Sequence, residues 1–227
     1  MGDSKSVHDS IKAYWASSSR REHVADMAHI RGAGRWRDGQ LWLKLGEENV
    51  SRILDFTGDI GSALEWGPGG GANARALCAR GVDVFGVDIS DHSLDAASKA
   101  CKGLSGGFTP VETELESPEA VLSGEIQKFD LIYSTACFQH FPDRAYALRV
   151  LRTMHGLLSD GGKIVLQVRY GPSSARESPT YNDTTMLSYT TFDIAEFWTF
   201  LRRFKFEPRR IELSERERYA WYFATRA

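Results

Sequence analysis

The sequence has little of what marks secreted, metal-binding or membrane-spanning proteins. Its three cysteines are an odd number without the spacing of a metal site, which indicates a reducing cytoplasm. No window approaches the run of about 20 apolar residues that spans a bilayer, and the N-terminus lacks the apolar core of a secretory signal. The net charge is −2, whereas nucleic-acid and membrane-surface binders usually carry a basic surplus. We therefore expect a cytoplasmic protein with no nucleic-acid partner and no membrane partner.

What the sequence does have is a cluster of glycines between an apolar run and a helical stretch. Residues 60–77 read IGSALEWGPGGGANARAL, in which Glu65 precedes Gly67, Gly69 and Gly71. This order predicts a strand, a tight turn and a helix whose free N–H groups point toward a ligand. The glycines fit both the G-x-G-x-x-G/A pattern of dinucleotide sites and an E-x-G-x-G-x-G pattern, so that alone they leave the cofactor class open.

A second acidic residue strengthens the interpretation of the turn. The run VDVFGVDI, residues 82–89, is nearly continuous in apolar character, as in a strand buried on both faces of a parallel sheet. It ends in Asp88, which lies 17 residues after Gly71, close to the spacing of a carboxylate that binds ribose hydroxyls. Ser90 or Asp91 suffices to cap the next helix, which leaves Asp88 free for a ligand.

Apolar runs alternate with helical patterns along the whole chain, which is typical of an α/β fold. Helices are expected over residues 6–28 and 38–56, and Gly46 is expected to divide the second of them. Further strands are expected near residues 63–66, 107–113, 130–136 and 163–170.

The C-terminal part begins with a polar, turn-rich stretch, residues 171–189, which is long for a plain connection and is therefore a candidate substrate loop. A helix should follow it, capped by Thr190 or Thr191. The last two β-like runs, residues 207–215 and 218–226, are close enough in sequence to pair as an antiparallel hairpin.

Four residues are candidates for contact with a substrate. His140 follows the fourth strand, where it either accepts a proton or only orders the FQHFPD turn. Arg169 and Tyr170 end the fifth strand, and the arginine either binds a carboxylate or phosphate or forms an internal salt bridge. Tyr14 lies on an aromatic N-terminal helix, which either only packs on the domain edge or also covers the ligand as a lid.

Five segments in this order resemble the class I S-adenosylmethionine-dependent methyltransferases: LEWGPGGGANA, VFGVDIS, PVETELESP, FDLIYSTACFQHFPD and LLSDGGKIVLQVRY. The resemblance covers about residues 60–227. It implies an α/β fold with a doubly wound, mostly parallel seven-stranded sheet of order 3-2-1-4-5-7-6, strand 7 antiparallel, and helices on both faces. Residues 1–58 would form an N-terminal helical cap or lid, and residues 59–227 the methyltransferase domain.

The resemblance also implies the roles of individual residues toward S-adenosyl-L-methionine and its product S-adenosyl-L-homocysteine, with no metal. Asp88 would hold the ribose hydroxyls, Ile89 would line the adenine and Glu114 would lie near its amino group. Thr135 would contact the methionine moiety. The methionine and ribose portions would be surrounded by residues of the glycine turn, namely Glu65, Gly67, Gly69 and Gly71.

The function that follows is methyl transfer to an oxygen or nitrogen atom of a small molecule, such as a natural-product intermediate. An RNA or protein methyltransferase is the first alternative, although the D/N-P-P-Y signature is absent after the fourth strand, where STACF stands. A nicotinamide-dependent oxidoreductase would need a Tyr-x-x-x-Lys pair, which is also absent, and a non-catalytic nucleoside-binding module would leave His140 without a role. The sequence leaves open whether the chain is a monomer or a homodimer.

Overall fold

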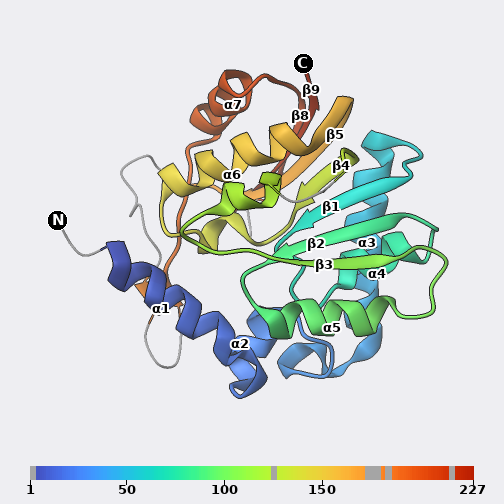
Figure 1. Cartoon of the computed structure of the whole chain (residues 1–227), viewed down its shortest axis with the longest axis vertical. Helices are drawn as coiled ribbons and strands as arrows, with labels where there is room; N and C mark the ends of the chain where they lie inside the picture. Colours follow the sequence, from blue (N-terminus) through green and yellow to red (C-terminus); the bar gives the residue numbers. More distant parts are fainter. Residues whose placement is uncertain (1–3, 124–126, 172–179, 182–185, 215–217) are drawn as a thin grey trace. The chain divides into compact units, whose positions relative to one another are not determined.

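The computed structural model of the chain describes residues 4–123, 127–171, 180–181, 186–214 and 218–227. Its main sheet has seven strands in the order β3-β2-β1-β4-β5-β9-β8, and β6 pairs with β7 in a separate two-stranded sheet (Figure 1). The strands are β1 Ser62–Trp66, β2 Asp83–Asp88, β3 Phe108–Glu112, β4 Phe129–Ser134, β5 Leu158–Arg169, β6 Thr180–Tyr181, β7 Met186–Ser188, β8 Phe206–Ser214 and β9 Tyr219–Arg226.

This order confirms the predicted topology, because β8 and β9 are the sixth and seventh strands of the main sheet. Strand β9 pairs antiparallel with β5 and with β8, and the expected C-terminal hairpin is therefore also confirmed. The expected substrate loop, residues 171–189, falls largely outside the described residues; within it the structure describes Gly171, the short strands β6 and β7, and Tyr189.

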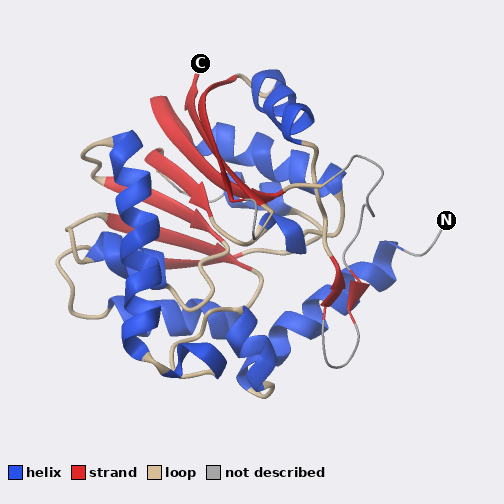
Figure 2. Ribbon diagram, turned by 180° about the vertical axis from the view of Figure 1, so that it is seen from behind, coloured by secondary structure: helices blue, strands red, loops and turns tan. Residues whose placement is uncertain are grey.

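Helices flank the strands (Figure 2). The α-helices are α1 Ser4–Ala16, α2 Glu22–Met27, α3 Gly39–Thr57, α4 Ala72–Cys78, α5 Asp91–Cys101, α6 Arg144–Leu157 and α7 Ile194–Arg203, and the short 3-10 helices are η1 Ser17–Ser19, η2 Gly34–Arg37, η3 Pro118–Ser123 and η4 Phe138–His140. Within the described part of the chain, no helix is both long and apolar enough to cross a membrane. The fold consists of two compact units, residues 1–116 and residues 117–227.

The first unit contains the parallel strands β1, β2 and β3, with α5 packed beside β3 (Figure 1). Val84 and Val87 of β2 are fully buried, which agrees with a strand covered on both faces. The strand ends are in register, so that Asp88 of β2 lies opposite Glu112 of β3.

The expected helix over residues 6–28 is wrong as a single element. The chain forms α1, the 3-10 turn η1 and α2 instead. Three serines occupy η1, and the Ser17 hydroxyl donates a hydrogen bond to the Tyr14 carbonyl oxygen at 2.5 Å. Serine side chains compete for backbone groups in this way, which explains why the helix ends here.

The expected division of the second helix at Gly46 is also wrong, since α3 is continuous from Gly39 to Thr57. Gly46 is buried, and a Cβ atom added to it would collide with the carbonyl oxygen of Ala72, the first residue of α4. The glycine therefore permits close packing of α3 against α4, which outweighs its low helix propensity.

Gly46→Ala is accordingly expected to lower the free energy of unfolding by about 1–3 kcal/mol, although alanine is the better helix former. Chemical denaturation measures this, with Ser51→Ala at an exposed position of α3 as the control that should change little. A Gly46→Ala protein as stable as the wild type would contradict the packing role.

The second unit has an aromatic core beneath β5 and β9. Phe192, Phe197 and Tyr222 are buried, and the Phe197 ring lies 5.1 Å from Phe192 and 4.7 Å from Tyr222 between centroids. Helix α7 begins at Ile194, and Asp193 caps it by accepting hydrogen bonds from the N–H groups of Ala195 and Glu196.

The expected caps of α7, Thr190 and Thr191, are therefore wrong. The Thr190 hydroxyl instead donates to the carbonyl oxygen of Phe141 at 2.7 Å. This bond connects the segment before α7 to the turn after β4. Asp193 is the stronger cap because its carboxylate accepts two backbone N–H groups at the helix start.

Candidate active site

The glycine turn of the first unit forms as predicted between β1 and α4. Gly67, Gly69 and Gly71 all have positive φ angles, 76°, 50° and 79°. Gly71 is the left-handed N-cap of α4, and its N–H donates to the Pro68 carbonyl oxygen at 2.9 Å. Because other residues enter this region only with strain, the turn requires glycine at these positions.

The turn is also approached closely by protein backbone, which the sequence did not indicate. The N–H of Gly70 donates to the carbonyl oxygen of Ala28 at 2.8 Å. A Cβ atom added at Gly69 would collide with that same oxygen, and one added at Gly70 would collide with the carbonyl oxygen of His29. The missing side chains of these two glycines therefore make room for the N-terminal segment.

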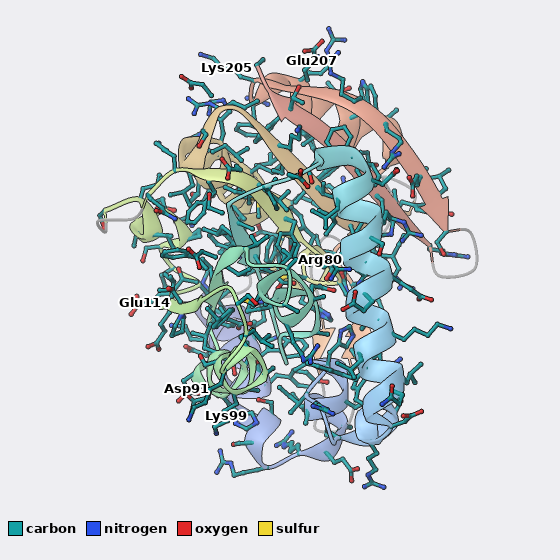
Figure 3. The ribbon with its side chains drawn as sticks, turned by 90° about the vertical axis from the view of Figure 1, so that its right-hand side faces the viewer. Arg80, Asp91, Lys99, Glu114, Lys205 and Glu207 are labelled. Atoms are coloured by element: carbon teal, nitrogen blue, oxygen red, sulfur yellow. The ribbon has the colours of Figure 1, made fainter. Side chains whose placement is uncertain are left out.

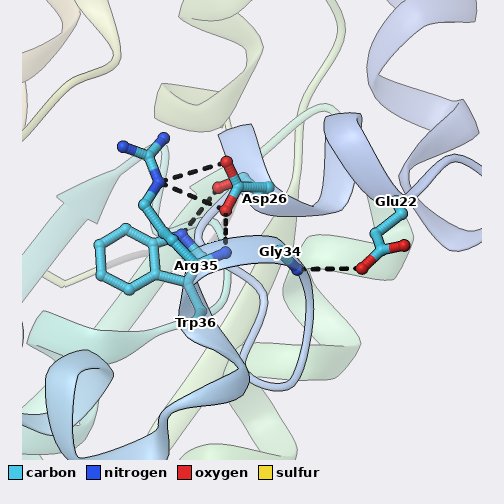
Figure 4. A network of polar contacts seen from close by, with 5 residues as sticks. All are labelled: Glu22, Asp26, Gly34, Arg35 and Trp36. Carbon is cyan, nitrogen blue, oxygen red and sulfur yellow. Dashed lines mark hydrogen bonds and ion pairs between the residues drawn. The ribbon is translucent and has the colours of Figure 1, made fainter.

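A polar network connects residues within the N-terminal segment (Figure 4). Asp26 accepts from the backbone N–H of Arg35 at 2.8 Å and pairs with its guanidinium at 3.2 Å, and its own carbonyl oxygen accepts from the Trp36 indole at 2.8 Å. His29 stacks edge-on against Trp36, with ring centroids 4.8 Å apart. Burial lowers the pKa of His29 to about 4, with the Arg35 cation as the second cause, so that its imidazole is neutral at pH 7.

Asp88 lies at the end of β2 with its carboxylate held by backbone amides. Ser90 donates its N–H to the carboxylate at 3.0 Å, and the amides of Ile89 and Gly69 also contact it. Burial raises the pKa of Asp88 to about 6, although these hydrogen bonds act in the opposite direction. Ser90 caps α5 by accepting from the Ser93 N–H, which confirms that Asp88 is not needed as the helix cap.

Glu65 is the fully buried acid of the glycine motif. The side-chain amide of Asn73 in α4 donates to its carboxylate at 2.8 Å, and Asn49 of α3 donates to Asn73 at 3.1 Å. A buried carboxylate is stable only when it is hydrogen-bonded, and this chain of amides fixes its orientation.

The end of β3 presents more than one residue that could contact adenine. Glu114 is exposed (Figure 3), and Glu112 is the residue opposite Asp88. Thr113 lies between Glu112 and Glu114 in the chain and donates its N–H to the Asp88 carbonyl oxygen at 3.0 Å. Its buried hydroxyl has no partner among the described residues. The role of Glu114 toward adenine stays a prediction, and Thr113 is a second candidate at the same strand end.

These features of the first unit fit a ligand with neighbouring hydroxyl groups. A carboxylate held by amides, a glycine turn with positive φ angles and a buried hydroxyl without a partner among the described residues lie on neighbouring strand ends. Ile89 follows Asp88 directly and is half-buried. Tyr14 is buried within the N-terminal segment, where its ring contacts Trp15 and His23 at centroid distances of 5.2 Å and 6.2 Å.

The turn after β4 in the second unit carries the remaining predicted residues. Thr135 is half-buried, and Ala136 has a φ angle of 48°, which is unusual for a residue with a side chain. Gln167 stabilises this conformation by accepting the Ala136 N–H at 2.9 Å. The N–H of His140 donates to Cys137 at 2.8 Å, so that the imidazole extends from a fixed 3-10 turn.

Arg169 at the end of β5 lies against two aromatic rings. Its guanidinium carbon is 4.4 Å from the ring centroid of Tyr189 and 5.6 Å from that of Tyr219. The Tyr189 ring also lies 6.2 Å from the His140 ring. Tyr170, the next residue, donates its N–H to the Arg218 carbonyl oxygen at 2.9 Å and bridges to Phe192.

The second unit thus brings His140 and Arg169 to the same aromatic cluster, which contains Tyr189 and Tyr219. The sequence prediction missed both tyrosines, and it also missed Gln139, which contacts Tyr219 and His140. No signal in a single sequence marks these three as neighbours. Among the described residues of the chain, no group of three histidine, cysteine or acidic side chains is placed to hold a metal ion.

A family model described as a methyltransferase domain matches residues 64–164 of the chain. These residues extend from β1 across the glycine turn, Asp88 and His140 to β5.

Two curated relatives each match less than half of the chain. A ubiquinone biosynthesis O-methyltransferase of Leptothrix cholodnii is 29% identical over 103 residues, which are 45% of this chain and 42% of that protein. Its namesake in Methylococcus capsulatus is 31% identical over 83 residues, 37% of this chain and 34% of that protein. The chain thus matches less than half the length of these two relatives.

Solved structures match over most of the chain. A magnesium protoporphyrin IX methyltransferase of Synechocystis with bound S-adenosylhomocysteine has a TM-score of 0.65 and 15% identity, covering 99% of this chain and all of that one. An amino pentose methyltransferase of Micromonospora echinaspora with bound S-adenosylmethionine has a TM-score of 0.64 and 16% identity, covering 82% and 92%. At such low identity the likeness establishes the fold.

Proposed function

We propose that this chain is a class I S-adenosylmethionine-dependent methyltransferase that transfers a methyl group to an oxygen atom of a small molecule such as a natural-product intermediate, a proposal supported by the matching family model and by the fold. The observation that carries the proposal is the Asp88 carboxylate beside the glycine turn, inside the matched residues 64–164. A carboxylate at the end of this strand is suited to accept hydrogen bonds from both hydroxyls of a ribose.

The cofactor would be held chiefly by residues of the first unit. Asp88 would accept the ribose hydroxyls, and Ile89 with Thr113 or Glu114 would contact the adenine. Gly67 and its neighbours would allow the methionine portion to approach the backbone. S-adenosylmethionine itself supplies the activated methyl group, so that the protein has to position the acceptor and take up its proton.

An oxygen acceptor is supported by the relatives that are named O-methyltransferases and by His140. A hydroxyl group usually needs a base before it attacks, and a neutral imidazole can take its proton at pH 7. Arg169 and Tyr170 would contact the acceptor, and Thr135 the methionine portion. An anionic acceptor would pair with the Arg169 guanidinium.

The N-terminal segment, residues 1–58, would act as the cap over the cofactor. This role is supported by the contacts of Ala28 and His29 with the glycine turn and by the network around Asp26. Residues 171–189 would form the acceptor loop. Tyr14 lies in the cap and would reach the acceptor only if the cap moves, since its ring is buried.

Transfer of a labelled methyl group tests the proposed function. The protein is incubated with methyl-labelled S-adenosylmethionine and, separately, catechol, 3,4-dihydroxybenzoate, 3-aminobenzoate, bulk RNA and a mixed protein extract. We expect label in a hydroxyl compound as an ether. Label confined to the amine, to RNA or to protein would contradict an oxygen acceptor of small size and favour one of the alternatives.

The pKa of Asp88 predicts how cofactor binding depends on pH. The ribose hydroxyls need the deprotonated carboxylate, whose pKa in the protein is about 6. Affinity for S-adenosylhomocysteine should therefore be nearly constant from about one pH unit above this pKa upward, and about tenfold weaker at pH 5, where roughly a tenth of Asp88 is ionised. Calorimetric titration at pH 5 and well above pH 6 measures the ratio of the two affinities. Because the ligand binds the deprotonated carboxylate, proton release on binding below pH 6 is a second expected result.

The same group affects stability in the opposite direction. Because its pKa is raised from 3.8 to about 6 in the folded chain, the folded state binds more protons than the unfolded state within this window. The contribution of Asp88 to folding stability should therefore rise as the pH falls from 6 toward 4. If the affinity of Asp88→Asn for S-adenosylhomocysteine also falls about tenfold toward pH 5, a group other than Asp88 titrates in this range.

A further inference from the structure

Gln139 has a buried polar side chain that contacts the ring of His140. It follows Phe138 in the 3-10 turn η4 and is 2% exposed. Its amide nitrogen Nε2 lies 2.8 Å from the Ala136 carbonyl oxygen, 2.9 Å from the Tyr219 hydroxyl and 3.2 Å from Nε2 of His140. Its amide oxygen has no partner among the described residues.

The orientation of this amide is determined by Ala136. A carbonyl oxygen can only accept a hydrogen bond, so the atom of Gln139 that faces it must be the nitrogen. One of the two N–H groups is used there. The other N–H faces the Tyr219 hydroxyl, which accepts from it, and the ring nitrogen Nε2 of His140.

We infer that Gln139 is a positioning residue that holds His140 as the neutral tautomer with its proton on Nδ1 and a lone pair on Nε2. An Nε2–H group would face the N–H group of Gln139, and two donors repel each other. Nε2 is then the nitrogen that would take up the proton of the acceptor. This last step rests on the proposed function, whereas the choice of tautomer does not.

Tyr219 explains how Nε2 becomes available for a proton. The amide N–H that His140 shares has the Tyr219 hydroxyl as a second acceptor at 2.9 Å. When a substrate hydroxyl donates to Nε2, the amide can turn its N–H fully to Tyr219 and no buried donor is left without a partner. Gln139 thus keeps Nε2 unprotonated in the free enzyme and can release it to the acceptor.

The described contacts of three residues near His140 do not distinguish its two ring nitrogen atoms. Tyr189 presents its ring at 6.2 Å, and Arg169 lies over the rings of Tyr189 and Tyr219. Cys137 accepts the backbone N–H of His140 through its carbonyl oxygen. The Gln139 amide, in contrast, contacts Nε2 and not Nδ1.

Nitrogen NMR of protein labelled with ¹⁵N-histidine tests the inference directly, without cofactor or acceptor. The His140 signal is assigned by its loss in His140→Asn. We expect the Nδ1–H tautomer to exceed the Nε2–H tautomer by roughly tenfold, the ratio that one buried hydrogen bond produces. In Gln139→Glu the carboxylate accepts from Nε2–H, so the preference should invert and the imidazole should titrate at higher pH.

Gln127→Glu is the matched control, because it makes the same substitution at an exposed site of the same unit and should leave the tautomer unchanged. Gln139→Met removes the amide without adding charge, and it should bring the tautomer ratio near unity. If Gln139→Glu does not fold, the wild-type spectrum and Gln139→Met still decide the question. A wild-type His140 with its proton on Nε2, or a ratio that Gln139→Met leaves unchanged, would overturn the inference.

Activity measurements separate this inference from the proposed function. If an acceptor is methylated, the acidic limb of the rate profile should shift to higher pH in Gln139→Glu and stay in place in Gln127→Glu. If the wild-type protein methylates none of the acceptors, the proposed function is contradicted, but the NMR result on the tautomer is unaffected. A tautomer change without any change in the rate profile would overturn the assignment of Nε2 as the proton acceptor.

Discussion

Replacing Asp88 with alanine is expected to weaken the binding of S-adenosylhomocysteine by about 100-fold or more at pH 7.5. In the wild type the carboxylate would accept two hydroxyl groups, and each hydrogen bond to a charged group contributes about 1.5–3 kcal/mol. The loss of both corresponds to roughly 3 kcal/mol or more, which is a factor of at least 100. Calorimetric titration of the two proteins measures this ratio.

Asp91→Ala is the matched control, because Asp91 is an exposed carboxylate three residues away whose described contact is the N–H of His92. Its affinity for S-adenosylhomocysteine should equal that of the wild type. Asp88→Ala should itself remain folded at pH 7.5, since a carboxylate with a raised pKa costs stability when ionised. Equal affinities of Asp88→Ala and Asp91→Ala would remove Asp88 from the cofactor site.

Replacing His140 with asparagine is expected to lower the rate of methyl transfer to a hydroxyl compound by about 10²- to 10⁴-fold, the usual contribution of a positioned base. Asparagine is chosen because it is close to imidazole in size and cannot take up the proton. Affinity for S-adenosylhomocysteine should stay as in the wild type, because the expected ribose contact is in the first unit. Steady-state rates at saturating cofactor measure the loss.

The control for this prediction is His92→Asn, a half-buried histidine of α5 in the first unit. It should keep the wild-type rate. In His140→Asn the rate of methyl transfer should also no longer fall at low pH. If His140 only ordered the 3-10 turn, this pH dependence would remain. An unchanged rate would mean that His140 only orders the turn after β4.

Much of the fold could be predicted because its signals are local. The buried strand β2, the glycine turn and the C-terminal hairpin each have a pattern within about ten residues, and the strand order followed from the family resemblance. The points at which helices end or continue could not be predicted in this way. Helix α3 continues through Gly46 because Ala72 packs against this glycine, and such a contact between distant residues leaves no trace in a single sequence.

The candidate site divides in the same way. Asp88 and the glycine turn were predicted from their spacing, since one β-unit connects them. The glycines have a second role that spacing did not reveal, because the backbone of Ala28 and His29 occupies the space of two missing side chains. Gln139 and Tyr219 meet across 80 residues of chain, so that their contact emerges only in the folded protein.

Calorimetric titration of the wild-type chain with S-adenosylhomocysteine and, separately, with NAD decides which cofactor the glycine turn and Asp88 bind. We expect S-adenosylhomocysteine to bind once per chain, with an affinity that weakens below pH 6, and NAD to give no heat of binding. Binding of NAD in its place, or no binding of S-adenosylhomocysteine at any pH, would contradict the assignment of the glycine turn and Asp88 to a methyltransferase cofactor.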